Sequence, residues 1–241
     1  MSHGMDRLIE RVRGGLIVSC QALDDEPLHG ANIMPRMAVA AAAGGAVGIR
    51  ANGAEDIRQI KTEVDLPVVG IVKRTYADTL VYITPTMREV AEVVTAGADV
   101  VSMDATSRLR PNGLTLPKLV QQIRNQFPDV ILMADVSTLE EGIEAAGLGF
   151  DLVASTMSGY TQYSKNFSNP NFDLIESLVR HVDVPVIAEG HISTPEEAAR
   201  CIELGCISVV VGSAITRPQV ITRNFVDRIK QVQESVNQSA P

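Results

Sequence analysis

The sequence predicts an α/β fold, a single closed (βα)8 or TIM barrel in which eight parallel strands are each followed by a helix. Two observations favour this fold. Short apolar runs rich in β-branched residues alternate with helix-capping patterns along the whole chain. The chain has 241 residues, close to the roughly 250 residues that are typical of such barrels, and no proline- or glycine-rich linker divides it.

The predicted strands are nearly continuous apolar runs, such as Val68-Val69-Gly70-Ile71-Val72. Unbroken apolar runs are typical of strands that are buried on both faces, as in a parallel sheet covered by helices. In chain order the predicted strands are residues 15–22, 46–50, 67–72, 99–104, 130–135, 151–156, 184–189 and 207–212.

The segments between the strands carry helix-start patterns. Thr194-Pro195-Glu196-Glu197 combines a capping threonine, a proline and an acid at the third helical position, and Gly205 can end that helix. Similar patterns begin at Thr86 and Thr138. The alternatives are two domains or a doubly wound open sheet. An open sheet normally has a glycine-rich phosphate turn after its first strand, where this chain has Ser19-Cys20-Gln21-Ala22, so the closed barrel is favoured.

The composition excludes several classes of protein. Lysine and arginine number 21 against 29 acidic residues, a formal net charge of −8, which argues against extended nucleic-acid and anionic-membrane surfaces. The sequence has no run of about 18 apolar residues that would indicate a membrane span. A small anionic ligand stays compatible, because a few local donors can hold it.

The cysteines and the amino terminus bear on the compartment. Three cysteines, Cys20, Cys201 and Cys206, are too sparse for a disulfide framework and favour a reducing cytoplasm. Met1-Ser2-His3-Gly4 lacks the apolar segment of a secretory signal and is interpreted as an expression remnant. Residues 1–4 are therefore set apart, and one barrel is expected over residues 5–235.

A barrel of this kind places its chemistry at the carboxyl ends of its strands. The polar residues predicted there are Gln21, Arg50, Lys73, Asp104, Asp135, Thr156, Glu189 and the pair Gly212-Ser213. Polar residues are expected wherever a strand gives way to a loop, which accounts for Thr156 and Asp104. It accounts less well for Lys73 and Glu189, which follow apolar runs directly and are predicted to point into a partly desolvated mouth.

Lys73 has two chemical uses that the residues leave open. A lysine with a lowered pKa can act as a general base, and a lysine can form a Schiff base with a carbonyl. Arg50 would lower the Lys73 pKa and Glu189 would raise it, so the net direction is open. Arg74 is expected to point to the opposite face from Lys73.

The last two strand ends have the features of a phosphate site. Gly190 follows the seventh strand and Gly212-Ser213 the eighth, which is the usual phosphate location in this fold. Arg217 stands near a helix start, where the helix dipole disfavours a cation, so an anion beside it would explain its presence. The alternative is that these glycines form ordinary turns.

Two further features complete the candidate site. The histidines, including His191, lack metal-binding spacing, so no metal site is predicted, and His191 is expected at the surface. Tyr160 lies in a long loop after the sixth strand, which is either a substrate cover or a variable surface connection.

Seven segments together resemble the N-acetylmannosamine-6-phosphate 2-epimerase family. They are Ser19-Cys20-Gln21-Ala22, Gly48-Ile49-Arg50-Ala51-Asn52-Gly53, Gly70-Ile71-Val72-Lys73-Arg74, Tyr82-Ile83-Thr84-Pro85-Thr86, Asp104-Ala105-Thr106, Ala188-Glu189-Gly190 and Val211-Gly212-Ser213-Ala214-Ile215-Thr216-Arg217-Pro218. The resemblance spans almost the whole chain. It implies a phosphate-binding (βα)8 barrel that interconverts N-acetylmannosamine 6-phosphate and N-acetylglucosamine 6-phosphate in bacterial sialic-acid degradation, without a metal or other cofactor.

The resemblance also implies roles for the candidate residues. Lys73 and Glu189 are expected to be catalytic and to handle the C2 proton. The expected substrate-binding residues are Gln21, Arg50, Asp135, Thr156 and Tyr160, and the expected phosphate-binding residues are Gly190, Gly212, Ser213 and Arg217. A Schiff-base aldolase and a non-catalytic sugar-phosphate binding protein remain as alternatives. The expected partners are the sugar phosphate and a second copy of the chain, with no nucleic acid and no membrane.

Overall fold

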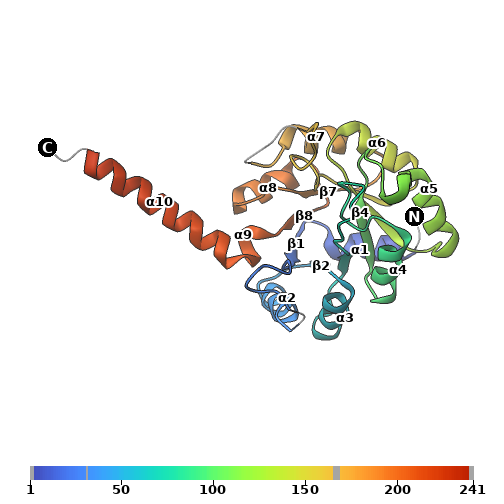
Figure 1. The fold of residues 1–241 in the computed structure, drawn as a ribbon, viewed down its shortest axis with the longest axis horizontal. Helices are drawn as coiled ribbons and strands as arrows, with labels where there is room; N and C mark the ends of the chain where they lie inside the picture. The colour runs from blue at the N-terminus through green and yellow to red at the C-terminus, as the bar shows by residue number, and fades with distance from the viewer. Residues whose placement is uncertain (1–2, 31, 165–168, 239–241) are drawn as a thin grey trace.

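Eight parallel strands close into a barrel in chain order, with β8 pairing back onto β1 (Figure 1). The structure is a computed structural model that describes residues 3–30, 32–164 and 169–238. Every predicted strand is present, so the predicted (βα)8 barrel is confirmed. The strands are β1 (Gly15–Cys20), β2 (Gly48–Asn52), β3 (Val68–Ile71), β4 (Val100–Asp104), β5 (Ile131–Asp135), β6 (Leu152–Ala154), β7 (Val186–Glu189) and β8 (Ser208–Val211).

Helices lie around the outside of the barrel between successive strands (Figure 1). They bury their apolar faces against the outward side chains of the strands. They are α2 (Met34–Ala43), α3 (Ala54–Glu63), α4 (Met87–Thr95), α5 (Leu116–Gln126), α6 (Leu139–Gly147), α7 (Phe172–His181) and α8 (Pro195–Glu203), with a short 3-10 turn (Pro111–Gly113) before α5. After β8 come α9 (Ser213–Thr216) and α10 (Pro218–Gln238).

The predicted capping residues begin their helices. Thr86, Thr138 and Thr194 each form a capping box with the acid three residues later, at the starts of α4, α6 and α8. Gly205 follows α8 with a φ of +101°, a left-handed conformation that glycine adopts without a Cβ penalty. The local sequence therefore fixes where these helices begin and end.

Several predicted strand ends differ from the observed ones. The first, third, sixth and eighth strands end one or two residues earlier than predicted, so Gln21 and Thr156 follow their strands, and the second strand ends later. The sequence indicated that the second strand ends at Arg50, but β2 continues to Asn52 because Ala51 and Asn52 pair with Gly70 and Ile71 of β3. Arg50 therefore lies within the strand, 1% exposed, rather than at its end.

The amino-terminal end of the barrel is closed by α1 (His3–Val12). Met5, Leu8, Ile9 and Val12 recur every three or four residues, are buried, and belong to one cluster with the inward side chains of the barrel. Those inward side chains include Ile17, Val69, Val100, Met133, Leu152, Ala154, Ile187, Ile207 and Val210. Within the described residues, α1 therefore fills the amino-terminal end of the barrel.

The predicted domain limits, residues 5–235, stay a prediction. His3 and Gly4, within the segment set apart as an expression remnant, already belong to α1, and residues 1–2 lie outside the described residues. At the other end, α10 leaves the barrel and projects away from it (Figure 1). None of the described helices combines the length and the apolar character that crossing a bilayer requires.

Gly70 lies at the tightest point between β3 and its helices. A Cβ built there would lie 2.6 Å from Val93 Cγ1, 2.7 Å from Ala98 Cβ and 2.9 Å from Ile57 Cδ1. No side chain fits in that space without moving β3. Since Lys73 follows β3 two residues after its end, the glycine also helps to set the position of the lysine.

We predict that Gly70→Ala lowers the free energy of unfolding by about 1 to 3 kcal/mol, the usual cost of overpacking a core. Gly147→Ala is the matched control, because its Cβ would meet nothing within 4 Å and it lies in α6. Chemical denaturation of both variants measures the difference. Equal stability of G70A and G147A would contradict the close packing of β3.

Candidate functional site

A cavity of about 830 Å³ opens at the carboxyl end of the barrel. Its lining includes most of the predicted site residues, drawn from both halves of the chain. They are Gln21, Arg50, Lys73, Thr156, Tyr160, Glu189, Gly190, Gly212, Ser213 and Arg217. Asp135 is the exception, because its carboxylate is fully buried below the cavity floor.

Arg50 forms the floor of the cavity through a network of ion pairs. Its Nη2 donates to Asp135 Oδ2 at 2.7 Å and its Nη1 donates to Glu189 Oε2 at 2.8 Å. Burial alone would lower the Arg50 pKa, but the carboxylates of Asp135 and Glu189 outweigh it and raise that pKa. The guanidinium is therefore a permanent positive charge at the centre of the mouth.

Asp135 holds this guanidinium in place from below. Besides the ion pair with Arg50, it accepts hydrogen bonds from Ser102 Oγ at 2.9 Å and from Thr156 Oγ1 at 2.6 Å. Asp135 was predicted to hold the sugar; its carboxylate has no exposed surface and contacts Arg50. Ser102 was not among the predicted site residues, because it lies inside the apolar run of β4.

Lys73 is carried by a strand-like loop that folds back over the mouth. Its backbone N–H donates to Asn52 Oδ1 at 2.8 Å, and it forms an isolated antiparallel bridge with Ile83. Arg74 instead pairs with Glu89 and Glu92 of α4, which confirms that it faces the other way. Within the described residues, the Lys73 amine has no ion pair or hydrogen bond, so it is free to reach a ligand.

The environment of Lys73 settles the direction that the sequence left open. Burial, together with the positive charges of Arg50 and Arg217, lowers the pKa of Lys73 to about 8, against the opposing effect of Glu189 and Glu26. A substantial fraction of the amine is therefore neutral near physiological pH, which a general base requires.

Glu189 approaches from the other side of the mouth. It ends β7, and β7 lies four strands from β3 in a ring of eight. Burial raises the pKa of Glu189 and the Asp135 carboxylate adds to the rise, against the lowering effect of Arg50. Its Oε2 also lies 3.2 Å from Thr156 Oγ1. Since the single Thr156 hydroxyl proton is donated to Asp135 at 2.6 Å, this contact is a hydrogen bond when the Glu189 carboxyl group is protonated and donates to the hydroxyl oxygen. The Glu189 carboxyl group is therefore held in position, whereas the amine of Lys73 is not.

The predicted phosphate residues lie together after β7 and β8. Gly190 has a φ of +107°, which favours glycine at this position. A Cβ on Gly212 would lie 3.3 Å from Ser19 Cβ, so the backbone approaches β1 closely. Arg217 Nη1 donates to Ser213 Oγ at 3.2 Å. These residues present backbone and guanidinium donors along one side of the cavity.

The anion that the sequence predicted beside Arg217 is present as a side chain of the protein itself. Arg217 Nε lies 2.9 Å from Glu26 Oε1, and Arg217 Nη2 donates to Glu26 Oε2 at 3.0 Å. Glu26 belongs to the loop between β1 and α2. Glu26 was not among the predicted site residues, although the position of Arg217 at a helix start indicated an anion beside it.

Tyr160 and His191 form a stacked pair at the edge of the cavity. Their ring centroids are 4.8 Å apart with an interplanar angle of 10°. Both rings line the cavity, and Nε2 of His191 is buried without a hydrogen-bond partner among the described residues. His191, expected at the surface, is therefore part of the mouth. Tyr82 also lines the mouth; it lies in one of the motifs without having been assigned a role.

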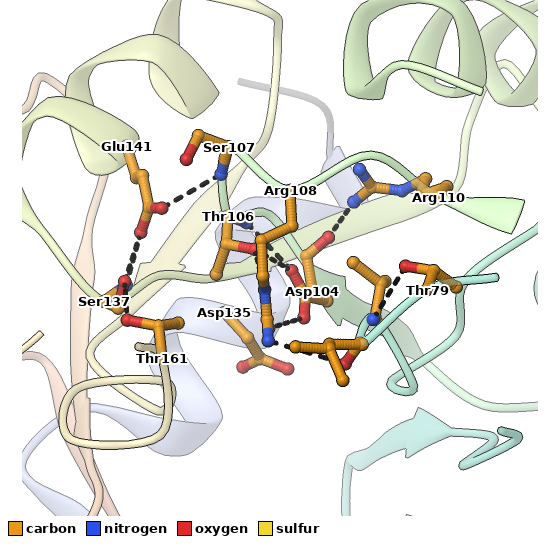
Figure 2. Close-up of polar contacts among 12 residues, drawn as sticks. Thr79, Asp104, Thr106, Ser107, Arg108, Arg110, Asp135, Ser137, Glu141 and Thr161 are labelled. Atoms are coloured by element: carbon orange, nitrogen blue, oxygen red, sulfur yellow. Dashed lines mark hydrogen bonds and ion pairs between the residues drawn. The ribbon is translucent and has the colours of Figure 1, made fainter. Parts of the chain in front are cut away.

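Asp104, the other acidic strand end, belongs to a structural network beside the site. Its carboxylate accepts from Thr106 and from Arg108 Nη2, and Arg110 donates to its backbone carbonyl (Figure 2). In the same view Ser107 N and Ser137 Oγ donate to Glu141, which ties the loops after β4 and β5 together. Asp104 does not line the cavity, as expected of a polar residue at the start of a loop.

None of the three cysteines lines the cavity. All three cysteines are buried free thiols. Within the described part of the chain, no three His, Cys, Asp or Glu side chains come together as a metal site would require. The prediction that the reaction uses no metal stays a prediction.

Comparisons with known proteins agree with this arrangement. The sequence profile of the family described as "Putative N-acetylmannosamine-6-phosphate epimerase" matches residues 34–231. A relative from Caldanaerobacter subterraneus, described as a 2-epimerase of the same substrate, is 55% identical over 224 residues, which is 93% of this chain and 94% of the relative. One from Listeria monocytogenes is 48% identical over 229 residues, 94% of this chain and 97% of the relative.

The fold is also similar to those of two solved structures. The N-acetylmannosamine-6-phosphate 2-epimerase from Clostridium perfringens superposes with a TM-score of 0.88 at 53% identity, covering 91% of this chain and 95% of that one. A thiamine phosphate pyrophosphorylase from Pyrococcus furiosus, at 19% identity and a TM-score of 0.56 over 83% of this chain and 86% of its own, shares the fold alone. The chain belongs to the N-acetylmannosamine-6-phosphate 2-epimerase family, which consists of carbohydrate epimerases.

Proposed function

We propose that this chain interconverts N-acetylmannosamine 6-phosphate and N-acetylglucosamine 6-phosphate by moving a proton at C2, without a metal ion. The names of its relatives support the substrate. The observation that carries the proposal is the pairing of Lys73, with a lowered pKa, and Glu189, with a raised pKa, on opposite strands of one cavity. Such a pair supplies a base and an acid near neutral pH.

The reaction begins with opening of the sugar ring. The C2 proton becomes acidic only when C1 is an aldehyde, and the cyclic form must first pass a proton from O1 to O5. Glu189 is suited to this transfer, because its raised pKa lets the carboxyl group hold or release a proton near neutral pH. Arg50 and Thr156 keep that carboxyl group in one position.

Lys73 then acts at C2. The lone pair of the neutral amine takes the C2 proton, the C–H electron pair forms the C1–C2 double bond, and the carbonyl π pair moves onto O1. The resulting enolate carries its negative charge near the Arg50 guanidinium, which stabilises it by charge and does not need to reorganise. This fixed cation supplies the stabilisation for which other enzymes use a metal.

The proton returns to the opposite face of C2. We assign this step to Lys73 as well, because its amine has no ion pair within the described residues, whereas the Glu189 carboxyl group is held by two hydrogen bonds. The intermediate turns about the C2–C3 bond and presents its other face to the ammonium. The donors of Gly190, Gly212, Ser213 and Arg217 anchor the phosphate meanwhile, and Gln21 and Tyr160 contact the sugar.

We predict that Lys73→Met removes C2 proton exchange with solvent and epimerisation together, lowering both rates by about 10² to 10⁴-fold or more, as expected for loss of a general base. Proton NMR of N-acetylmannosamine 6-phosphate in heavy water measures both. Lys118→Met is the matched control, because Lys118 is exposed on α5. Unchanged exchange in K73M, or a borohydride-trapped adduct between the wild type and its substrate, would contradict the role.

If Lys73 both removes and returns the C2 proton, a deuterium label at C2 is expected to be partly retained. With substrate deuterated at C2 and solvent water, the epimerised product retains part of the label, at most about one third, because the ammonium carries three equivalent hydrogens. Retention is highest at the acid end of the active range, where the amine exchanges slowly. Glu189→Gln turns over more slowly but retains the same fraction. A product without deuterium at every pH would show that a different group returns the proton.

We propose further that the chain forms a homodimer in the bacterial cytoplasm through α10. Seven helices follow β1 to β7 and pack on the barrel, whereas after β8 the chain forms the short α9 and then leaves (Figure 1). Along α10, Ile221, Phe225, Ile229 and Val232 recur every three or four residues. Phe225 is 67% exposed and Ile229 58%. A second copy is the occupant that would cover this stripe, since oligomers of one chain are the usual case.

The double variant Phe225→Asp, Ile229→Asp is expected to shift the protein from dimer to monomer, because two charges cannot enter an apolar interface without loss of affinity. Sedimentation velocity measures the mass. The control is Asp227→Asn with Arg228→Gln, exposed polar positions on the same helix. A wild type that sediments as a monomer, or a dimer that F225D/I229D leaves intact, would contradict this interface.

A further inference from the structure

Glu26 stands out among the acidic residues near the mouth because its carboxylate is fully occupied. Oε1 is 2.9 Å from Arg217 Nε and accepts from Gln219 Nε2 at 3.1 Å. Oε2 accepts from Arg217 Nη2 at 3.0 Å and from the backbone N–H of Leu23 at 2.8 Å. Four donors around one carboxylate form a built site rather than a chance surface contact.

Glu26 contacts one edge of the Arg217 guanidinium and leaves the other edge free of any carboxylate among the described residues. The edge formed by Nε and Nη2 faces Glu26 in a bidentate pair, and Nη1 on the remaining edge donates to Ser213 Oγ in the phosphate cradle. Arginine has five donors in a rigid plane, so fixing one edge fixes the direction of the other.

Glu26 cannot easily give way to a phosphate. Its own backbone N–H bonds to the Leu23 carbonyl at 2.9 Å while its side chain accepts from the Leu23 N–H. The carboxylate is thus tied into the turn that carries it. An incoming phosphate meets the free edge of Arg217 and the backbone around Gly212, not the edge that Glu26 covers.

We propose that Glu26 is a positioning residue, which fixes the Arg217 guanidinium so that its free edge faces the phosphate of the substrate. The proposal rests on the phosphate cradle of the proposed function. It extends that cradle to the loop between β1 and α2, which contributes a negative charge to an anion-binding site. That charge is favourable only through the orientation it gives Arg217, because it repels the phosphate directly.

Arg217 and Glu26 also shift the pKa of Lys73, in opposite directions. Arg217 lowers the Lys73 pKa and Glu26 raises it, beside the larger effects of burial and of Arg50 and the opposing effect of Glu189. Removing one charge of the pair therefore moves the pH profile in a direction that depends on which residue is changed. A variant that only lost stability would leave the pH profile where it is in the wild type.

The test compares Glu26→Ala and Glu26→Gln with Asp25→Asn. Asp25 is an exposed carboxylate of the same loop that lines the cavity, and among the described residues it has no ion pair. We expect E26A to raise the KM for the sugar phosphate and the Kd for inorganic phosphate by about tenfold or more, the factor for one charge-assisted hydrogen bond. The kcat stays near that of the wild type. E26Q, which keeps the shape, gives a smaller increase, and D25N gives none.

The pH profile supplies the second readout. The rise of kcat/KM with pH, which follows deprotonation of Lys73, moves to lower pH in E26Q and to higher pH in Arg217→Ala. Unchanged or tighter phosphate binding in E26A overturns the positioning role and leaves the proposed function standing. Unchanged binding in R217A overturns the cradle and the inference with it. A wild type that binds the sugar phosphate but does not epimerise it contradicts the proposed function itself.

Discussion

The ion pair between Arg50 and Asp135 is the constraint on which the rest of the site depends. A guanidinium that is 1% exposed needs compensating charge, and Asp135 below it and Glu189 beside it supply that charge. The pair fixes a positive charge at the floor of the barrel. That charge adds to the effect of burial in lowering the Lys73 pKa and ties Glu189 to one side of the mouth. In the proposed mechanism it also stabilises the enolate.

The barrel brings Lys73 and Glu189 to the same open end from opposite sides. Its closed amino-terminal end, filled by α1, leaves one open rim, and β3 and β7 bring the amine and the carboxyl group to that rim from opposite sides. The two groups differ in how they are held. Glu189 is held by Arg50 and Thr156, whereas the Lys73 amine has no hydrogen bond or ion pair within the described residues. The proposed division of the proton transfers rests on this difference.

The sequence predicted the fold and most of the site because both depend on local patterns. Apolar runs located every strand, threonine caps located three helices, and residues after the runs, such as Lys73 and Glu189, were found by position alone. What it did not predict depends on pairing across the barrel. Asp135 looked the same as Lys73 in the sequence, but it lies beneath Arg50 and not in the cavity. Glu26 lies in a polar loop with no strand pattern, and only the fold brings it to Arg217.

Burial, together with the positive charges of Arg50 and Arg217, keeps the Lys73 amine partly neutral near physiological pH. The most direct measurement is the titration of that amine itself by NMR of the protein labelled with 13C at the lysine Cε carbon, with the Lys73 signal assigned by its loss in K73M. We expect the Lys73 amine to titrate with a pKa of about 8 in the free enzyme. A Lys73 amine that titrates near 10.4, the value of an unperturbed lysine, would contradict it.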